Sequence, residues 1–317
     1  MNESAPESSE FLICGDIHGH LQLVLSVAAL WQRSHRRVLA GIFLCGDVGT
    51  LTDETEIDNA TRAHARTDPA ELEFLNQWSA NPPAPWLAEY FVPEEDGGLG
   101  IVCPIVMVHG NHEGFRKLAA LHPNRIPELP VSIEALPTVD SGGRIRWLPS
   151  GWRTVGPGGR IFAGLGGIER GQRTAQYHDL AYIDQDAATE LCSLEPGAVD
   201  VLLTHQGPAS TQGRQGSETL DVLLETRVAK HCFHGHSTRH DEFKTVHDTK
   251  VFPLPDAHKC FRERPRSGFG WCQWQNDELR VARQLPEFIR ELRPKKWRRT
   301  KEGLMVRPLA TPSSVVI

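Results

Sequence analysis

The sequence lacks the features that would place the chain in a membrane. None of its uncharged apolar stretches approaches the length needed to span a bilayer. The first ten residues are acidic and polar, whereas a secretory signal begins with positive charge followed by an apolar segment. We therefore expect a cytoplasmic protein without a membrane partner. An excess of positive charge is also missing, because the formal net charge of −6 gives no overall attraction toward nucleic acid.

A disulfide framework and a nucleotide-binding P-loop are missing too. The seven cysteines are odd in number and scattered, and four sit inside apolar runs, as expected of buried free thiols in a reducing compartment: Cys14, Cys45, Cys103 and Cys232. The glycine-rich segment 164–171 lacks the Gly-Lys-Ser/Thr ending of a P-loop. At 317 residues the chain is long enough for a sizeable core, and residues 1–9 have the composition of a disordered segment.

The sequence does contain five short apolar runs, each followed closely by residue types that bind metal ions. Such runs predict buried strands, and in open α/β sheets sites form beyond the carboxyl ends of the strands. The six side chains placed at these strand ends are Asp16, His18, Asp47, Asn111, His205 and His236. Chance rarely supplies five such coincidences in one chain. We therefore predict a metal-dependent hydrolase that acts on phosphate esters.

Two divalent cations about 3.5–4 Å apart can clamp the attacking and leaving oxygens of an in-line displacement at phosphorus and make hydroxide available as nucleophile. Asp16 and His18 can reach one cation together, and Asp47 is the candidate bridge between both. The second cation would also be held by Asn111, His205 and His236. Oxygen and nitrogen ligands without thiolate suit manganese, iron or zinc. His112 is placed to protonate the leaving alkoxide as general acid.

The rest of the sequence predicts strands and helices that alternate around this site. Strands are expected near 11–14, 38–44, 101–108, 144–148, 160–163, 199–204, just before His236, and as a pair over 268–274 and 279–281. Helices are expected near 20–33, 114–121, 184–194 and 217–226. Residues 49–100, with a helix over 69–78, are interpreted as a large insertion over the active-site face. We assign 10–285 to a catalytic domain and 286–317 to a basic tail.

The residues at the five strand ends resemble, in order, the five motifs of the calcineurin-like metallophosphoesterase superfamily: Gly15-Asp-Ile-His-Gly, Gly46-Asp47, Gly110-Asn-His-Glu113, Thr204-His205 and Gly235-His236. The resemblance covers roughly residues 11–240. It implies a four-layer α/β/β/α sandwich with two mixed sheets and a dinuclear site at its edge. It also implies the ligand roles given above, with Asp47 shared by both metal ions and His112 as the catalytic acid.

The chain departs from two subfamily patterns. Many members carry a second histidine two residues after the one that matches His236, whereas this chain has Thr238, so one ligand of the first metal is missing or supplied otherwise. Ser/Thr protein phosphatases require Asp-Arg three and four residues past the bridging aspartate, where this chain has Thr50-Leu51. His109 stands where they place a phosphate-binding arginine. It is therefore a candidate substrate contact, and a protein phosphatase is disfavoured.

Several segments look more like RNA lariat debranching enzymes: Cys45-Gly-Asp-Val, Gly110-Asn-His-Glu113, Arg146-Trp-Leu, Gly164-Leu-Gly-Gly-Ile168, Tyr177-His-Asp179 and Leu203-Thr-His-Gln-Gly-Pro208. Those enzymes tend to have cysteine at the position of Asp16 and histidine at that of Thr238. The resemblance therefore implies a debranching-type phosphodiesterase and leaves its substrate open.

Candidate substrate contacts also lie outside the motifs. Arg170 and Arg173 follow the glycine-rich loop and are candidates to hold phosphate oxygens. The basic tail around Trp297 is a candidate contact for a nucleic-acid backbone, with Trp297 stacking on a base. A solvated charged terminus is the commoner role of such a segment.

The leading prediction is an enzyme that cleaves phosphodiesters of nucleic acid or nucleotide type in slight preference to monoesters, because the insertion and the tail suit a larger substrate. One alternative is a phosphomonoesterase or dinucleotide polyphosphate hydrolase of the protein-phosphatase type. The other is a binding scaffold built on a degenerate fold, which the retention of His112 and the ligand residues disfavours. The sequence leaves the oligomeric state open.

Overall fold

The computed structural model describes residues 10–79, 84–85, 87–171, 178–239, 241, 243–260, 268–283, 292, 298–299 and 305–306. The predicted disordered segment 1–9, Arg173 and Trp297 lie outside the described residues. Within the predicted tail, β14 (Arg298–Arg299) and β15 (Met305–Val306) form a short antiparallel pair. No described helix is both long enough and apolar enough to cross a bilayer.

The described strands form two large mixed sheets. The first has the order β13-β12-β1-β2-β3-β5, in which β1, β2, β3 and β5 run parallel. Its strands are β1 (Glu10–Cys14), β2 (Gly41–Cys45), β3 (Ile105–Val108), β5 (Ile145–Trp147), β12 (Phe269–Gln275) and β13 (Glu278–Ala282).

The second sheet has the order β10-β11-β9-β8-β7-β6-β4, in which β11, β9, β8 and β7 run parallel. Its strands are β4 (Val131–Ser132), β6 (Arg153–Val155), β7 (Ile161–Leu165), β8 (Val199–Thr204), β9 (Ala229–Ser237), β10 (Lys244–Val246) and β11 (Thr249–Pro255).

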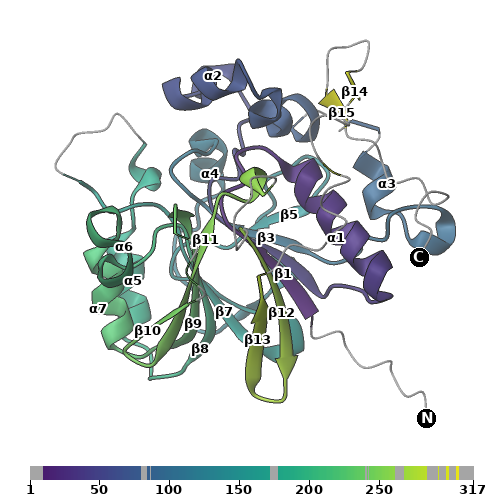
Figure 1. Ribbon diagram of the computed structural model, residues 1–317. Helices are drawn as coiled ribbons and strands as arrows, with labels where there is room; N and C mark the ends of the chain where they lie inside the picture. Colours follow the sequence, from purple (N-terminus) through teal and green to yellow (C-terminus); the bar gives the residue numbers. More distant parts are fainter. Residues whose placement is uncertain are drawn as a thin grey trace.

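Helices cover the outer face of each sheet (Figure 1). The long helix α1 (Leu21–His35) packs on the first sheet, while α5 (Gln185–Cys192) and α7 (Glu218–Glu225) pack on the second. The shorter helices are α2 (Asn59–Ala65), α3 (Leu87–Phe91), α4 (Phe115–Leu121) and α6 (Ala209–Gln212). The predicted four-layer α/β/β/α sandwich with two mixed sheets is confirmed.

The core between the two sheets is aromatic. Along β1 the side chains alternate, so that Phe11 and Ile13 face the second sheet while Leu12 and Cys14 face α1. Phe43 and Phe162 stack with ring centroids 4.6 Å apart across the sheet interface, and Phe11 contacts both rings edge-on. All seven cysteines are free, as predicted. A packed interface of this kind fixes the relative position of strand ends from both sheets.

The described residues of 49–100 form mainly short helical segments, of which α2 lies beside the edge of the sandwich (Figure 1). The helix predicted over 69–78 is present as one helical segment, 3-10 over Pro69–Leu72 and π over Phe74–Trp78, with Glu73 in the right-handed helical region between them. Glu73 accepts hydrogen bonds from the Gln22 backbone nitrogen (2.7 Å) and from Trp78 Nε1 (3.3 Å), which ties the middle of the segment to the start of α1.

Candidate metal centre

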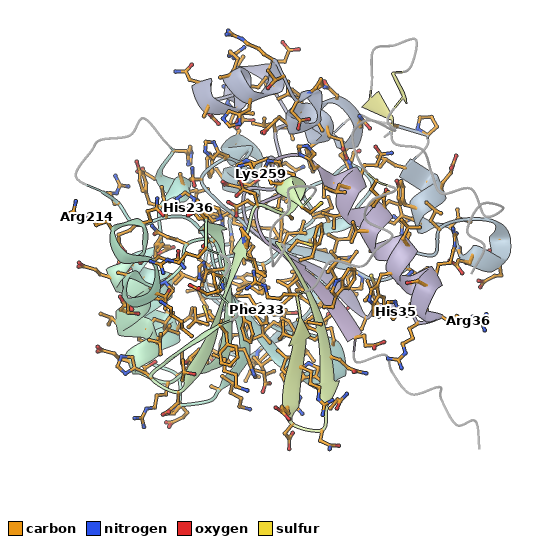
Figure 2. All side chains as sticks on the ribbon, viewed as in Figure 1. His35, Arg36, Arg214, Phe233, His236 and Lys259 are labelled. Carbon is orange, nitrogen blue, oxygen red and sulfur yellow. The ribbon has the colours of Figure 1, made fainter. Side chains whose placement is uncertain are left out.

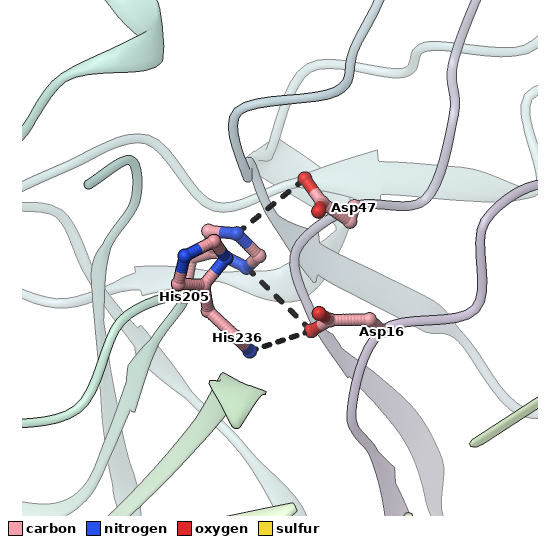
Figure 3. Close-up of side chains that lie close together, drawn as sticks. All are labelled: Asp16, Asp47, His205 and His236. Atoms are coloured by element: carbon pink, nitrogen blue, oxygen red, sulfur yellow. Dashed lines mark hydrogen bonds and ion pairs between the residues drawn. The ribbon is translucent and has the colours of Figure 1, made fainter. Parts of the chain in front are cut away.

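The carboxyl ends of the parallel strands of both sheets meet at one edge of the sandwich. Asp16 follows β1, Asp47 follows β2, Asn111 follows β3, His205 follows β8, and His236 lies near the end of β9. One ligand atom from each of Asp16, Asp47, His205 and His236 lies within 4.8 Å of the other three (Figure 3). Residues that are as many as 220 positions apart in the sequence are therefore brought to one point.

The donors in this cluster fit a metal ion. His205 Nδ1 donates to the Cys45 backbone oxygen at 2.9 Å, so Nε2 carries the lone pair of the neutral ring. Nε2 lies 3.0 Å from Asn111 Oδ1 and 3.4 Å from Asp47 Oδ1. Burial lowers the pKa of His205 to about 4, which keeps the ring neutral at pH 7. The lone pairs of His205, Asn111 and Asp47 thus meet with no hydrogen atom between them. A bound cation would stabilise this arrangement.

Glycines in the motifs make room for the carboxylates. A Cβ on Gly110 would lie 2.1 Å from Asp47 Oδ1 and 2.3 Å from the Asp47 backbone nitrogen. A Cβ on Gly235 would lie 2.0 Å from Asp16 Oδ1. Both contacts are far inside van der Waals distance. The motif glycines are therefore required because the backbone of one motif packs directly against the ligand side chain of another.

Three of the predicted ligands have a left-handed backbone. The φ angles are 43° at His18, 46° at Asp47 and 46° at His236. L-residues pay a steric cost in this region, and such residues cluster at functional sites where the surrounding structure holds them. The sharp turns that follow β1 and β2, and the turn within β9, thus aim the three side chains into the cluster.

The two central carboxylates are held by backbone amides. The His112 nitrogen donates to Asp47 Oδ1 and the His236 nitrogen donates to Asp16 Oδ1, each at 2.8 Å. Burial and the charge of Asp47 raise the pKa of Asp16 well above its usual value. Burial would also raise the pKa of Asp47, but the surrounding imidazoles, His205 foremost, hold it below its usual range. A divalent cation at this position would neutralise the two buried carboxylates.

A second group of donors adjoins the first. Asp16, His18 and Asp256 each place one ligand atom within 4.8 Å of the others, and His18 Nε2 lies 3.9 Å from Asp47 Oδ2. Asp256 is absent from the sequence prediction. It follows the run Val251-Phe-Pro-Leu-Pro255, whose prolines count against a strand. Among the described residues, β10 pairs only with Thr249–Val251 of β11. Pro253 and Pro255 therefore lie along an unpaired edge, where the missing N–H of proline costs no hydrogen bond.

His112 has a carboxylate partner from the insertion. Its Nδ1 lies 2.8 Å from Asp58 Oδ2, and Asp58 also caps α2 by accepting from the backbone nitrogens of Ala60 and Thr61. Burial alone would lower the pKa of His112, but the hydrogen bond to Asp58 and the charge of Asp47 raise it to about 9. The imidazole is therefore protonated at neutral pH. This is the state that a general acid needs before it donates.

Thr50 takes a different role from the aspartate that protein phosphatases place there. The buried Glu113 carboxylate accepts from the backbone nitrogens of Val48 and Thr50, both at 2.9 Å, and from Thr50 Oγ1 at 2.8 Å. It also accepts from the Gly110 nitrogen at 3.2 Å. Glu113 thus ties the loop after β2 to the loop after β3, and the carboxylate next to His112 is that of Asp58.

Two further carboxylates of the insertion approach site histidines. Asp68 Oδ2 lies 3.1 Å from His20 Nε2, and Glu71 Oε2 lies 4.0 Å from His18 Nδ1. Burial raises the pKa of Glu71 to about 7. Sequence reasoning gave none of these pairings, because each joins a strand-end loop to a distant turn of the insertion and neither partner lies in a periodic segment.

The described substrate contacts predicted from the sequence, His109 and Arg170, are not members of the cluster formed by Asp16, Asp47, His205 and His236. His109 is buried, accepts a hydrogen bond from Trp147 Nε1 at 3.2 Å, and has its pKa lowered to about 3, chiefly by burial. It is therefore a neutral core histidine and supplies no cationic phosphate contact. Arg170 is exposed, pairs with Asp179 at 2.9 Å and lies over the Tyr182 ring at 4.1 Å. Arg173 lies outside the described residues.

Comparison with known proteins identifies the family. The model of the calcineurin-like phosphoesterase family matches residues 9–239, and the chain belongs to that family. Two solved structures align with 87% of the chain and 99% of their own length. They are TT1561 of Thermus thermophilus, at 13% identity and a TM-score of 0.46, and an archaeal phosphodiesterase, at 12% identity and a TM-score of 0.37. No curated protein matches the chain significantly.

Proposed function

We propose that the chain is a hydrolase that uses two divalent cations to cleave phosphoesters, with phosphodiesters of nucleic acid or nucleotide type slightly favoured. The observation that supports the proposal most strongly is the cluster of Asp16, Asp47, His205 and His236, into which the lone pair of His205 points. In this proposal Asp16, His18 and Asp47 hold one cation, and the second is held by Asp47, Asn111, His205 and His236. Manganese, iron and zinc all suit these donors.

The bound cations would supply Lewis-acid activation of water and neutralise charge on the phosphoryl oxygens. The chain's own groups handle the leaving group. His112 keeps Nδ1 against Asp58, so Nε2 carries the proton that is donated to the leaving oxygen. Because an alkoxide is a poor leaving group, this donation matters most for alkyl esters. Asp58 holds the ring in place and keeps it charged before the reaction.

The resemblance to lariat debranching enzymes gains no support from the comparisons, so we propose no branched substrate. The preference for diesters rests on the insertion, which extends the site beyond the strand ends, and on the basic tail. A monoesterase or a dinucleotide polyphosphate hydrolase is the second candidate. Thr50, which contacts Glu113 and not His112, separates the chain from the protein-phosphatase pattern.

The first test compares hydrolysis of bis(4-nitrophenyl) phosphate with that of 4-nitrophenyl phosphate by the manganese-loaded protein. We expect faster turnover of the diester. Activity on the monoester alone would reject the diester preference, and absence of activity on both would favour a binding scaffold.

A His112→Ala variant tests the acid. We expect turnover to fall by about 100- to 10,000-fold, the usual contribution of a general acid, while both metal ions stay bound. His35→Asn is the matched control, because His35 lies at the far end of α1 on the surface (Figure 2). Unchanged turnover in His112→Ala would exclude His112 as the acid.

A further inference from the structure

Asp256 lies at the edge of the cluster without a role in the predicted site. It follows directly after β11. One carboxylate oxygen of Asp256 lies within 4.8 Å of a ligand atom of Asp16 and of a ligand atom of His18. Asp16 and His18 are the residues assigned to the first cation. A carboxylate in that position faces the same ligand space as they do.

The register of the second sheet explains why Asp256 lies there. β11 runs parallel to β9, and Pro255 is paired with Ser237. The residue that follows this pair is Asp256 after β11 and Thr238 after β9. Thr238 is the position at which the sequence lacks the expected histidine. Asp256 and Thr238 thus each follow the last paired residue of two neighbouring strands, after a register shift between Pro253 and Pro255.

The end of β11 is fastened to the loop that carries Asp16. The Ala257 nitrogen donates to the Asp16 backbone oxygen at 2.8 Å, and the Gly15 nitrogen donates to the Gly268 oxygen at 2.8 Å. Gly15 also packs so closely on β11 that a Cβ there would lie 2.3 Å from the Leu254 backbone oxygen. Asp256 and Asp16 thus form one rigid unit, as the ligands of one ion must.

The charges around Asp256 call for a cation. The carboxylate of Asp16 lies close both to that of Asp47 in one group of donors and to that of Asp256 in the other. The Lys259 ammonium pairs with Asp256 Oδ2. A carboxylate has two oxygens and about four lone-pair positions, so Asp256 can keep Lys259 on one side and a metal ion on the other. Lys259 and His236 lie at the same end of the sandwich (Figure 2).

We propose that Asp256 is a ligand of the cation held by Asp16, His18 and Asp47, and supplies from the neighbouring strand the donor that Thr238 does not. This rests on the proposed function. The first site then has three carboxylates and one imidazole, whereas the second has Asp47, Asn111 and two imidazoles. Carboxylates suit manganese, and imidazoles suit zinc, iron and copper. The first site is accordingly the more selective of the two for manganese.

Metal content tests the proposal directly. The full chain is stripped with a chelator, reloaded with Mn²⁺, and analysed by titration and by mass spectrometry of the bound metal. For Asp256→Ala we expect one of the two ions to bind at least about tenfold more weakly, while the other is retained. Asp277→Ala is the matched control, because Asp277 also pairs with a basic side chain, Arg160, but is fully exposed.

The metal content of Lys259→Ala tests whether Asp256 acts as a metal ligand or only as the ion-pair partner of Lys259. If Asp256 binds the cation, Lys259→Ala retains both ions. If Asp256 serves only to pair with Lys259, the two variants lose metal alike, and that result overturns the proposal. Two tightly bound ions in Asp256→Ala would also overturn it.

A measurement on the unmodified protein tests the proposal even if the Asp256→Ala variant does not fold. Crystals of the manganese-loaded chain give the ion positions from anomalous scattering. We expect an Asp256 oxygen within bonding distance of the ion beside His18, and an ion bound there without Asp256 would contradict the proposal. If the unmodified chain binds no metal at all, the proposed function fails. Two ions in the unmodified chain and two in Asp256→Ala refute only the role of Asp256.

Discussion

The strand-end loops and the insertion contribute to the site in different ways. The loops after β1, β2, β3, β8 and β9 present the donor atoms that are proposed to hold cations. The insertion presents carboxylates to imidazoles: Asp58 to His112, Asp68 to His20 and Glu71 to His18. One region thus presents the candidate ligands, and the other places carboxylates beside imidazoles, among which Asp58 helps to raise the pKa of His112.

This difference separates two kinds of failure. A change in the strand-end loops should remove metal and, with it, all activity. A change in the insertion should leave the metal bound and alter the rate and its dependence on pH. Variants from each region therefore test whether metal binding and pH dependence can be changed separately.

The largest effect is expected from Gly110→Ala. The new methyl group would lie 2.1 Å from Asp47 Oδ1 and 2.3 Å from the Asp47 nitrogen, so the bridging carboxylate must move. Overpacking of this kind typically costs about 1–3 kcal/mol of stability. We expect loss of at least one metal ion and of more than about 99% of activity, because a displacement of about 1 Å costs on the order of 100-fold in rate.

Gly171→Ala is the control for Gly110→Ala. No atom lies within 4 Å of a Cβ built at Gly171, and its φ is not positive, so the same chemical change meets no resistance. Bound metal and hydrolysis are measured for both. Full metal content in Gly110→Ala would show that the close packing of the motifs does not position Asp47.

A smaller effect is expected from Asp58→Asn. The amide removes the charge that raises the pKa of His112 to about 9. The protonated ring is the acid, so activity is present below this pKa and lost as pH rises through it. Without the carboxylate, the pKa of His112 falls. The basic limb of the kcat/KM profile should therefore move to lower pH, and the rate at pH 8 should fall by about 10- to 100-fold.

Asp53→Asn, in the same insertion, gives the comparison for Asp58→Asn. Asp53 also caps a short helical turn, but its partners are Thr55 and Arg116 and not a site histidine. It should leave the pH profile unchanged. Metal content should remain that of the unmodified chain in both variants. An Asp58→Asn enzyme that loses its metal ions would erase the distinction between the two regions.

A still smaller effect is expected from charge reversal in the tail, a third region. Lys295→Glu combined with Lys296→Glu should weaken binding of single-stranded oligonucleotides and reduce the dependence of that binding on salt. Hydrolysis of small diesters should not change. The measurement is a fluorescence anisotropy titration at two salt concentrations. Equal affinities in both proteins would assign the tail no part in binding nucleic acid.

The smallest effect is expected from Arg170→Ala. Arg170 is engaged with Asp179 and Tyr182 on the surface. Its loss should change KM for the small diester by less than about twofold, because exposed ion pairs contribute little. A KM raised tenfold or more in steady-state assays would restore Arg170 as a substrate contact and extend the site beyond the two regions compared here.

The strand-end cluster was predicted from a local pattern, an apolar strand followed by a polar side chain, whereas the sandwich was predicted from the resemblance to the family. Asp16, Asp47 and His205 each follow such a strand. Asp58 was missed because its function depends on a turn that folds back over the site. Asp256 was missed because prolines mask its strand, which only the pairing of β11 with β9 reveals.

The helix predicted over 69–78 is present, but its 3-10 and π hydrogen-bonding pattern was not predicted. Glu73 accepts tertiary hydrogen bonds there from the Gln22 backbone nitrogen and from Trp78 Nε1, and such contacts are not visible in local propensity. The prediction of His109 as a substrate contact came from a motif position that resembles that of a phosphate-binding arginine. The hydrogen bond between His109 and Trp147 was not predicted, because it joins residues 38 positions apart.

The central claim is that distant strand ends build one dinuclear site around Asp47. The most direct test is an anomalous diffraction experiment on the manganese-loaded chain, with metal content measured on the same sample. We expect two ions per chain, both in contact with the Asp47 carboxylate. A single ion, no ion, or an Asp47 side chain turned away from His205 would contradict it.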